Sequence, residues 1–227
     1  MGGSPSITVC TTVRSLAGTS VERTTLQLVP PPSDLARPMA DVRLRRWRLT
    51  DANDVAVMIE DGHLRPWSTM GDDLDGWIRR EVNEARGPTR AICLPHDDRA
   101  LGRVALRPPA FASEAVRCQA VRESDQPAGE LSYWLVPEAR GRGLAYAAVR
   151  EMLDSMAAAT GVRSVVLDIE AGNSRSMRLA ERLGAERRSP TRTEIDRCGT
   201  PRTLVVYVLP IPPEPGLGSY HPAIDGE

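Results

Sequence analysis

Lysine is absent from this 227-residue sequence, so all 29 of its lysine or arginine positions are arginine. The absence argues against a nucleotide-binding loop of the Walker type, because that loop contacts phosphate through a lysine. The arginines are balanced by 30 acidic residues, and the formal net charge is -1. A chain with so little net charge has no general attraction to nucleic acid or to a membrane surface, and we expect neither as a partner.

Cysteine and the aromatic residues are also scarce. The four cysteines, Cys10, Cys93, Cys118 and Cys198, are far apart, and none forms a CxxC pair or stands near two histidines. The pattern predicts neither a zinc site nor a disulfide framework, so we expect inert thiols and no metal. Phe, Tyr and Trp make up only 4% of the residues, so the core must rest mainly on aliphatic side chains.

Long apolar runs are missing too. No segment is long enough to cross a membrane, and the N-terminus lacks the charged and apolar regions of a signal peptide. We therefore expect a cytoplasmic protein.

The length suits one domain with irregular ends. Residues 1–39 contain a run of three prolines and little periodicity, which predicts a poorly ordered extension, with Met39 as the natural start. We expect a folded domain at 40–210 and a Pro/Gly-rich tail at 211–227.

Within the expected domain, apolar residues recur with helical or strand periodicity, and turn residues separate the segments. Residues 108–128 give no clear pattern, although 116–121 would suit a short strand. The elements that the periodicity predicts are strands at 42–47, 91–94, 101–106, 130–136, 162–169, 185–195 and 203–209, and helices at 51–61, 72–86, 142–159 and 173–183.

One stretch organises this pattern. The apolar strand that begins at Glu130 ends at Pro137, which has no amide proton for a ladder, and an Arg/Gly turn then leads into the long helix. The turn contains Gly141 and Gly143, whose lack of a Cβ atom lets the backbone wrap closely around a ligand. Helix N-termini present unpaired amides and a positive dipole end, so the sequence predicts an anion site, most simply for phosphate or pyrophosphate.

Three motifs, in their order along the chain and with the elements between them, resemble the GNAT acetyltransferase superfamily over residues 40–210. The first is Arg140-x-x-Gly143-x-Ala145. The second is Asn173-Ser174-Arg175-Ser176 followed by Leu183-Gly184-Ala185. The third is the opening Leu44-Arg45-Arg46-Trp47 with Asp51-Ala52, which is similar to the branch named for ribosomal-protein N-terminal acetyltransferases. The resemblance implies an α/β (α+β) fold with a mixed sheet of about seven strands, about four flanking helices, and a splay between the fourth and fifth strands.

The resemblance also implies acetyl-CoA as co-substrate, without a metal. Its pantetheine would pair with main-chain groups of Leu135 and Val136, as an added strand would. Asn173 would contact the pantetheine as well. The pyrophosphate would lie on amides of the turn, which comprises Arg140, Gly141, Arg142, Gly143, Leu144 and Ala145.

The implied reaction is direct attack of a neutral amine on the thioester. Family members often carry a Tyr that protonates the leaving thiolate, but the corresponding position here is Ala180, which leaves Ser176 as the candidate acid. Glu130 is the first candidate for the base, with Asp168 and Glu170 as alternatives, and an exposed strand-end carboxylate is the plain interpretation of each.

The resemblance predicts the acceptor only by class, as a protein N-terminus or a small amine. Arg65, Trp67, Trp77 and Trp134 are candidates for the wall of its site, although core packing is the default interpretation for the last two. An alternative function is a non-catalytic acyl-CoA-binding module of the same fold, which the missing Tyr would suit. A homodimer is compatible with the branch, but no residue pattern specifies it.

Overall fold

The computed structural model describes residues 6–15, 18–27, 40–62, 64–113 and 128–211. The chain divides into two compact units, Met1–Met39 and Ala40–Glu227. In the first unit, strands β1 (Ser6–Ser15) and β2 (Gly18–Gln27) pair antiparallel along their whole length. Thr and Val recur through both strands, and such β-branched residues favour an extended backbone.

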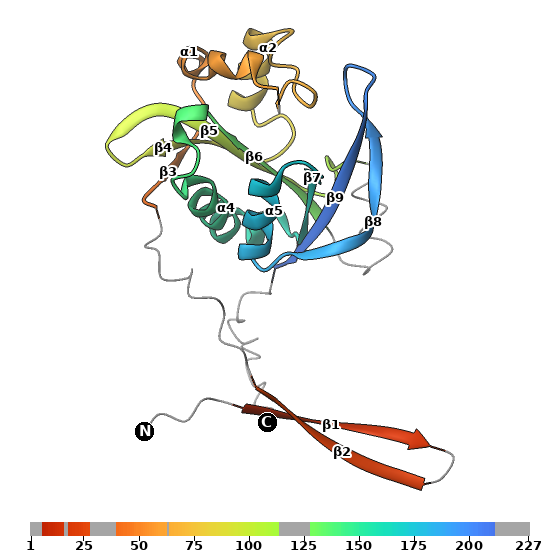
Figure 1. Ribbon diagram of the computed structural model, residues 1–227. Helices are drawn as coiled ribbons and strands as arrows, with labels where there is room; N and C mark the ends of the chain where they lie inside the picture. The colour runs from red at the N-terminus through yellow and green to blue at the C-terminus, as the bar shows by residue number, and fades with distance from the viewer. Residues whose placement is uncertain (1–5, 16–17, 28–39, 63, 114–127, 212–227) are drawn as a thin grey trace, which may run out of the picture. The chain divides into compact units, whose positions relative to one another are not determined.

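The second unit is built on one seven-stranded sheet, with the strand order β3-β4-β5-β6-β7-β9-β8 (Figure 1). Neighbouring strands are antiparallel except for the central pair, β6 and β7, which is parallel. The strands are β3 (Arg43–Arg45), β4 (Thr89–Leu94), β5 (Asp97–Arg107), β6 (Ala128–Leu135), β7 (Ser164–Glu170), β8 (Glu186–Ile195) and β9 (Pro201–Pro210).

Four α-helices accompany this sheet among the described residues, which confirms the expected mixed architecture. They are α1 (Ala52–Val55), α2 (Leu74–Val82), α4 (Leu144–Thr160) and α5 (Ser174–Arg182). Figure 1 shows α1 and α2 close together, and α4 and α5 side by side at another part of the sheet.

The strand alternation of β6 separates two chemical sides. Trp134 packs against Trp77 of α2, with ring centroids 6.0 Å apart, so it points to the α2 side. Ser132 points the same way, because its hydroxyl accepts a hydrogen bond from Arg103, which also binds Glu81 of α2. Tyr133 lies between them in sequence and therefore points to the opposite side, which α5 occupies.

The acidic residues at the first two helix starts have different roles. Asp73 caps α2, because its carboxylate accepts a hydrogen bond from the amide of Gly76 at 2.7 Å. Asp51 does not cap the segment that follows it. Its buried carboxylate instead binds Arg45 twice, at 2.8 Å each, and the amide of Arg48. The expected helix at 51–61 is correspondingly broken into α1 between two 3-10 turns, Leu49–Asp51 and Ala56–Glu60. The short strand considered at 116–121 lies outside the described residues.

Candidate functional site

The central feature of the site is the divergence of β6 from β7. The two strands pair only from Ala128↔Ser164 to Glu130↔Val166, although both continue well past these residues. Beyond Glu130, β6 remains paired with β5 on one side, and β7 remains paired with β9. The sheet is therefore splayed between the fourth and fifth strands of this unit, as expected.

The splay leaves main-chain groups of β6 without a strand partner. The amide of Val136 donates to the carbonyl of Leu101 at 2.9 Å, which fixes the alternation along the β5–β6 pair. The main-chain groups of Leu135 and Tyr133 must then point away from β5, toward the side where β7 diverges. The amide of Leu135, one of the two residues expected to pair with the pantetheine, therefore faces the splay. The amide of Val136, the other residue of that expectation, is used inside the sheet.

The turn before α4 has the backbone shape that its glycines permit. Gly141 has φ +75° and Gly143 has φ +80°, in the left-handed region that residues with a side chain rarely adopt. Leu144 is buried and begins α4, which anchors the helix in the core. The first amides of α4, from Leu144 onward, have no partner within the helix and carry its positive dipole end. This geometry suits an anion.

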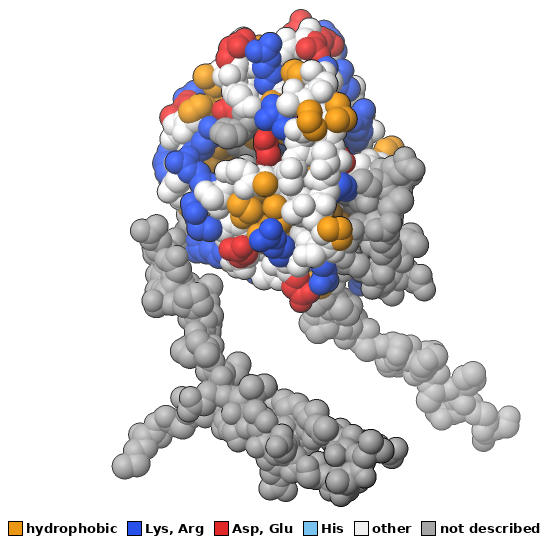
Figure 2. Space-filling view, turned by 45° about the vertical axis from the view of Figure 1, so that its right-hand side comes forward, with side chains coloured by type: hydrophobic (Ala, Val, Ile, Leu, Met, Phe, Trp, Pro, Cys, Tyr) orange, Lys and Arg blue, Asp and Glu red, His pale blue; other side chains and the backbone are white. Residues whose placement is uncertain are grey.

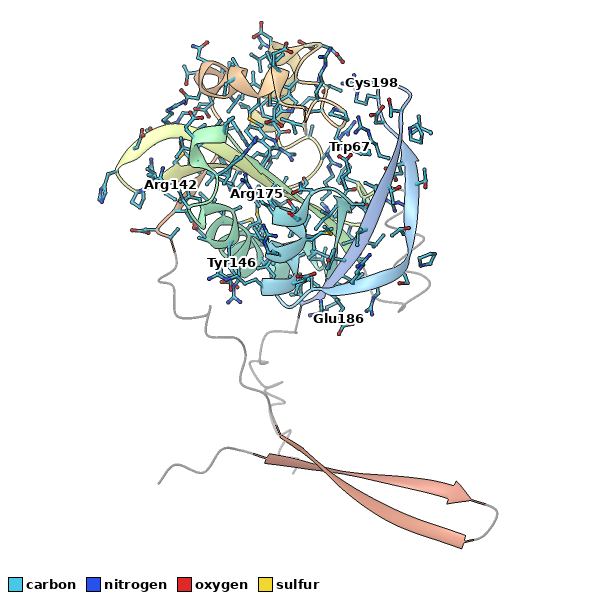
Figure 3. The ribbon with its side chains drawn as sticks, viewed as in Figure 1. Trp67, Arg142, Tyr146, Arg175, Glu186 and Cys198 are labelled. Atoms are coloured by element: carbon cyan, nitrogen blue, oxygen red, sulfur yellow. The ribbon has the colours of Figure 1, made fainter. Side chains whose placement is uncertain are left out.

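The side chain of Arg140 holds the turn from within. Its Nε donates to the carbonyl of Leu135 at 2.9 Å, and its guanidinium binds the Asp61 carboxylate at 2.6 Å. The amide of Arg140 donates to the carbonyl of Pro137 at 3.2 Å. This amide, which was expected to contact the pyrophosphate, is therefore not free for a ligand. Arg142, in contrast, is exposed on the turn and supplies the positive charge that Arg140 does not (Figure 3).

The second motif forms the start of α5. Asn173 caps the helix, and its Oδ1 accepts a hydrogen bond from the amide of Ser176 at 3.1 Å. Within the described structure its side-chain amide nitrogen makes no hydrogen bond, so this donor can face a ligand. Ala180, the position where relatives often carry a Tyr, is fully buried in the core.

A hydroxyl that sequence reasoning missed lies on this side. Tyr133 Oη is buried and has no hydrogen-bond partner among the described residues. Burial raises the pKa of Tyr133, and the nearby Ser176 side chain opposes this with a smaller lowering effect. The two hydroxyls are thus neighbours that do not form a regular hydrogen bond. The only signal for this hydroxyl is the place of Tyr133 on β6: it alternates with Ser132 and Trp134, in the part of the strand that continues past the pairing with β7.

Three carboxylates, of Glu130, Asp168 and Glu170, lie on the α2 side, because Glu130 pairs with Val166 in the parallel register and side chains alternate along each strand. Their surroundings differ. Glu130 binds Arg107 at 2.6 Å and the amide of Ser113 at 3.1 Å, so both of its oxygens are engaged. Glu170 binds Arg202 at 3.1 Å and is partly exposed.

Asp168 is the unusual member of the three. Its Oδ2 binds Arg192 at 2.5 Å, but its Oδ1 is buried and has no partner within the described structure. Burial raises the pKa of Asp168 to about 6, against the lowering effect of Arg192. Asp168 is therefore ionised near neutral pH and still accepts a proton readily, as a general base must. The first sequence candidate, Glu130, lacks this free oxygen.

The candidate acceptor wall divides into a core part and an exposed part. Trp77 and Trp134 form a cluster with Trp47, and Trp77 is only 6% exposed. Trp67 is 38% exposed and Arg65 is exposed, so both are accessible from solvent. Figure 3 shows Trp67 beside the β8–β9 hairpin.

Arg197, which the sequence did not single out, ties that hairpin to the segment of Trp67. Its amide donates to the carbonyl of Pro66 at 3.2 Å, and its guanidinium donates to the carbonyl of Ser68 at 2.5 Å and binds Asp72. The face shown in Figure 2 has arginine and acidic side chains interspersed among apolar ones, so no single charge dominates its described part.

No group of three or more His, Cys, Asp or Glu side chains that could hold a metal occurs in the described part of the chain. Over the same residues, none of the helices has the length and apolar character needed to span a bilayer.

Comparison with known proteins agrees with this geometry. Residues 41–186 match a family model described as an acetyltransferase (GNAT) domain. No curated protein gives a significant match. Among solved structures, an acetyltransferase (GNAT family) from Bacillus anthracis is 12% identical with a TM-score of 0.60, over 76% of this chain and 96% of the other.

Two further neighbours contain acetyl-CoA. The microcin C7 self-immunity acetyltransferase MccE, in complex with acetyl-CoA and AMP, is 15% identical with a TM-score of 0.56, over 78% of this chain and 100% of the other. NAA60 of Arabidopsis thaliana, in complex with acetyl-CoA, is 17% identical with a TM-score of 0.55, over 75% and 98%. At these identities the likeness shows the fold.

Proposed function

This chain belongs to the GNAT acetyltransferase family, and we propose that it is an acetyl-CoA-dependent N-acetyltransferase. The observation that carries the proposal is that two features adjoin at one end of β6: main-chain groups that face the splay, and the glycine turn before α4. The amide of Leu135 and the main chain of Tyr133, which have no strand partner on the side of the splay, lead directly into a glycine turn whose next amides begin α4. An extended pantetheine with a pyrophosphate at its end would satisfy both at once.

Asp168 is the proposed base. The amine must be neutral to attack, and its nitrogen must lose a proton once the C–N bond has formed. Asp168 offers a buried oxygen without a partner, on the α2 side of the sheet. Glu130 and Glu170 are held by Arg107 and Arg202, and their role here is to order this side of the splay.

The amide of Leu135 is the proposed donor to the oxyanion that forms on the thioester carbonyl. It points toward the splay rather than toward β5, and a fixed backbone donor needs no reorganisation during the reaction. Removing one such donor in other enzymes costs about 2.7–4 kcal/mol of transition-state stabilisation. Asn173, through its free side-chain nitrogen, would hold the pantetheine on the α5 side.

The acceptor is proposed to be a protein N-terminus or a small amine of low basicity. An α-amino group titrates near 7.7–8.0 and a lysine side chain near 10.4, so a much larger fraction of the former is neutral at pH 7. A carboxylate whose pKa is raised only to about 6 suits the less basic amine. The opening motif, which is similar to the ribosomal-protein branch, supports the same choice.

The test combines binding with turnover in the full chain. Thermal shifts with acetyl-CoA, CoA and ATP measure binding, and thiol release measures transfer to a panel of N-terminal peptides and small amines. We expect a shift with both CoA species, a smaller one with ATP, and thiol release with α-amines. No shift with either CoA species would overturn the proposal.

A non-catalytic acyl-CoA-binding module is the second candidate. The buried Ala180, which stands where relatives often have a Tyr, favours it. A thermal shift with acetyl-CoA, but no thiol release with any member of a broad panel, would support this function over the first.

A further inference from the structure

Tyr133 carries a buried hydroxyl that the fold does not use. Six buried side-chain atoms lack a hydrogen-bond partner among the described residues. Five belong to Arg43, Arg45, Arg107, Asp168 and Arg192, each of which forms an ion pair through another atom. The sixth is Tyr133 Oη, the one neutral group in the set.

We infer that Tyr133 is a catalytic residue that donates a hydrogen bond from its hydroxyl to the sulfur of the leaving CoA thiolate. This inference rests on the proposed acetyl transfer. It assigns the stabilisation of the leaving thiolate to a strand residue. The sequence offered only Ser176 for this task, because Ala180 has no hydroxyl.

The position of Tyr133 fits this task in two respects. It lies three residues beyond Glu130, the last residue of β6 that pairs with β7, so it is in the splayed part of the strand. Its side chain points to the α5 side, where Ser176 is its polar neighbour. The proposed base, Asp168, shares the opposite side with Trp134. The proton acceptor and the thiolate donor are therefore on opposite sides of the sheet.

The protonation state of Tyr133 also fits. Burial raises its pKa from an already high value, so the phenol keeps its proton throughout the physiological range. Such a group is a hydrogen-bond donor at every pH at which the amine reacts.

The step balances as follows. The amine nitrogen forms a bond to the thioester carbon, and the C–S bond breaks with its electron pair passing to sulfur. The nitrogen gives its proton to Asp168, which releases it to water. The thiolate is stabilised by the Tyr133 hydroxyl and takes its proton from water. Full transfer from the phenol is unfavourable, because a free thiol titrates near 8.5, below the phenol.

The unpaired hydroxyl has a cost for stability. A buried polar group without a partner destabilises the fold, so its removal should not lower stability. Tyr133→Phe is therefore expected to melt at the same temperature as the wild type or higher. A hydroxyl with a purely structural role would give the opposite result.

Tyr207→Phe is a matched control. Tyr207 is also buried, on β9, but its hydroxyl donates to Glu181 of α5 at 2.9 Å and is outside the proposed site. We expect Tyr133→Phe to lower kcat about 10- to 100-fold, the effect of losing a hydrogen bond to a charged group, with little change in KM for acetyl-CoA. Tyr207→Phe should leave kcat unchanged.

A titration of bound CoA separates this inference from the proposed function. If Tyr133 donates to the thiolate, the thiol of bound CoA should titrate at least about one pH unit lower in the wild type than in Tyr133→Phe, by thiolate absorbance. Equal titrations would overturn the role of Tyr133 while leaving CoA binding and transfer intact. Failure of the wild type to bind CoA would overturn both. If the wild type binds CoA without turnover, the titration still shows whether Tyr133 donates a hydrogen bond to the CoA thiolate.

Discussion

Arg140 and Asp61 form an ion pair at 2.6 Å that ties the turn before α4 to the segment after α1. Arg140 also donates to the carbonyl of Leu135, so one side chain connects the end of β6, the turn and the α1 region. The arginine that a family motif would assign to the ligand is thus occupied within the protein. Its contribution to binding must come largely through the shape of the turn.

Substitution of either partner should therefore weaken CoA binding. Arg140→Ala and Asp61→Ala each release the turn, and we expect each to raise the Kd for CoA several-fold and to cost about 1–3 kcal/mol of stability. Isothermal titration and chemical unfolding measure the two effects. The informative variant is Asp61→Ala, because a carboxylate cannot attract a phosphate. Unchanged or tighter CoA binding by Asp61→Ala would contradict the tether and favour a direct contact from Arg140.

The backbone of the turn gives a second prediction. A Cβ atom at residue 143 would lie 3.6 Å from that of Ala40, an ordinary contact, so Gly143→Ala acts through its φ of +80°. The left-handed conformation costs a residue with a side chain roughly 1–2 kcal/mol, and the turn should relax away from the anion-binding shape. We expect several-fold weaker CoA binding by calorimetry.

Gly199→Ala is the control for this strain. Gly199 has φ +79° in the turn between β8 and β9, with open space around its Cβ position. Its substitution should cost similar stability and leave CoA affinity unchanged. An equal loss of affinity in both variants would show that the turn before α4 has no special role.

Asp168 gives a prediction in pH. Its pKa is raised from 3.8 to about 6 mainly by burial, so the folded state binds the proton more tightly than the unfolded state does. Folding stability from this group is then greatest below about pH 4 and falls as pH rises through 6, by about 2–3 kcal/mol in all. Asp168→Asn should remove this decline, which unfolding at pH 4, 5, 6 and 7 would reveal.

The same variant should change the pH–rate profile. If Asp168 is the base, kcat/KM for the amine shows a limb near pH 6 in the wild type, besides the limb near pH 7.7–8.0 that comes from the amine itself. Asp168→Asn should lower the rate and remove the limb near pH 6, while the limb of the amine stays. Glu130→Gln is the comparison, since it breaks the 2.6 Å pair with Arg107 but leaves Asp168 in place. It should lower stability and keep the limb near pH 6. If Glu130→Gln instead removes the limb near pH 6, Glu130 is the base, as the sequence favoured.

The difference between these two carboxylates shows what the sequence can specify. Local signals were sufficient for the helix start at Asn173, where the cap and its amide are three residues apart, and for the glycine turn. The choice between Glu130 and Asp168 depends on Arg107 and Arg192, each more than twenty residues away on another strand. Such pairings follow from strand register, which composition and periodicity do not determine.

The same reasoning explains why Tyr133 was overlooked. A Tyr in an apolar strand has the pattern of a core residue. No local feature of the sequence shows that β6 diverges from β7 after Glu130. Tertiary packing also joins Arg197 to Ser68 and Asp72 across more than a hundred residues. The family motifs supplied the fold and the ligand class, whereas the assignment of roles needed the three-dimensional contacts.

Arg197 leads to the last prediction, which concerns the acceptor. It joins the β8–β9 turn to the segment that carries the exposed Trp67. Figure 3 shows Trp67 and Cys198 on the opposite side of the view from Arg142 of the glycine turn. Its partner Asp72 is largely exposed, so Arg197→Ala should cost less than about 1 kcal/mol of stability. Loosening the segment should raise KM for the amine several-fold and leave the Kd for CoA unchanged.

The comparison is Arg43→Ala, which breaks another exposed ion pair, with Asp98, on β3 at the opposite edge of the sheet. It should change neither constant. Steady-state kinetics with the amine identified by the thiol-release panel, together with CoA titration, measure both effects. The proposed base lies on the α2 side of the sheet, and the pantetheine is proposed to lie on the α5 side. A rise in the CoA Kd equal to the rise in KM in Arg197→Ala would contradict that separation. An unchanged KM would exclude the segment of Trp67 from the acceptor site.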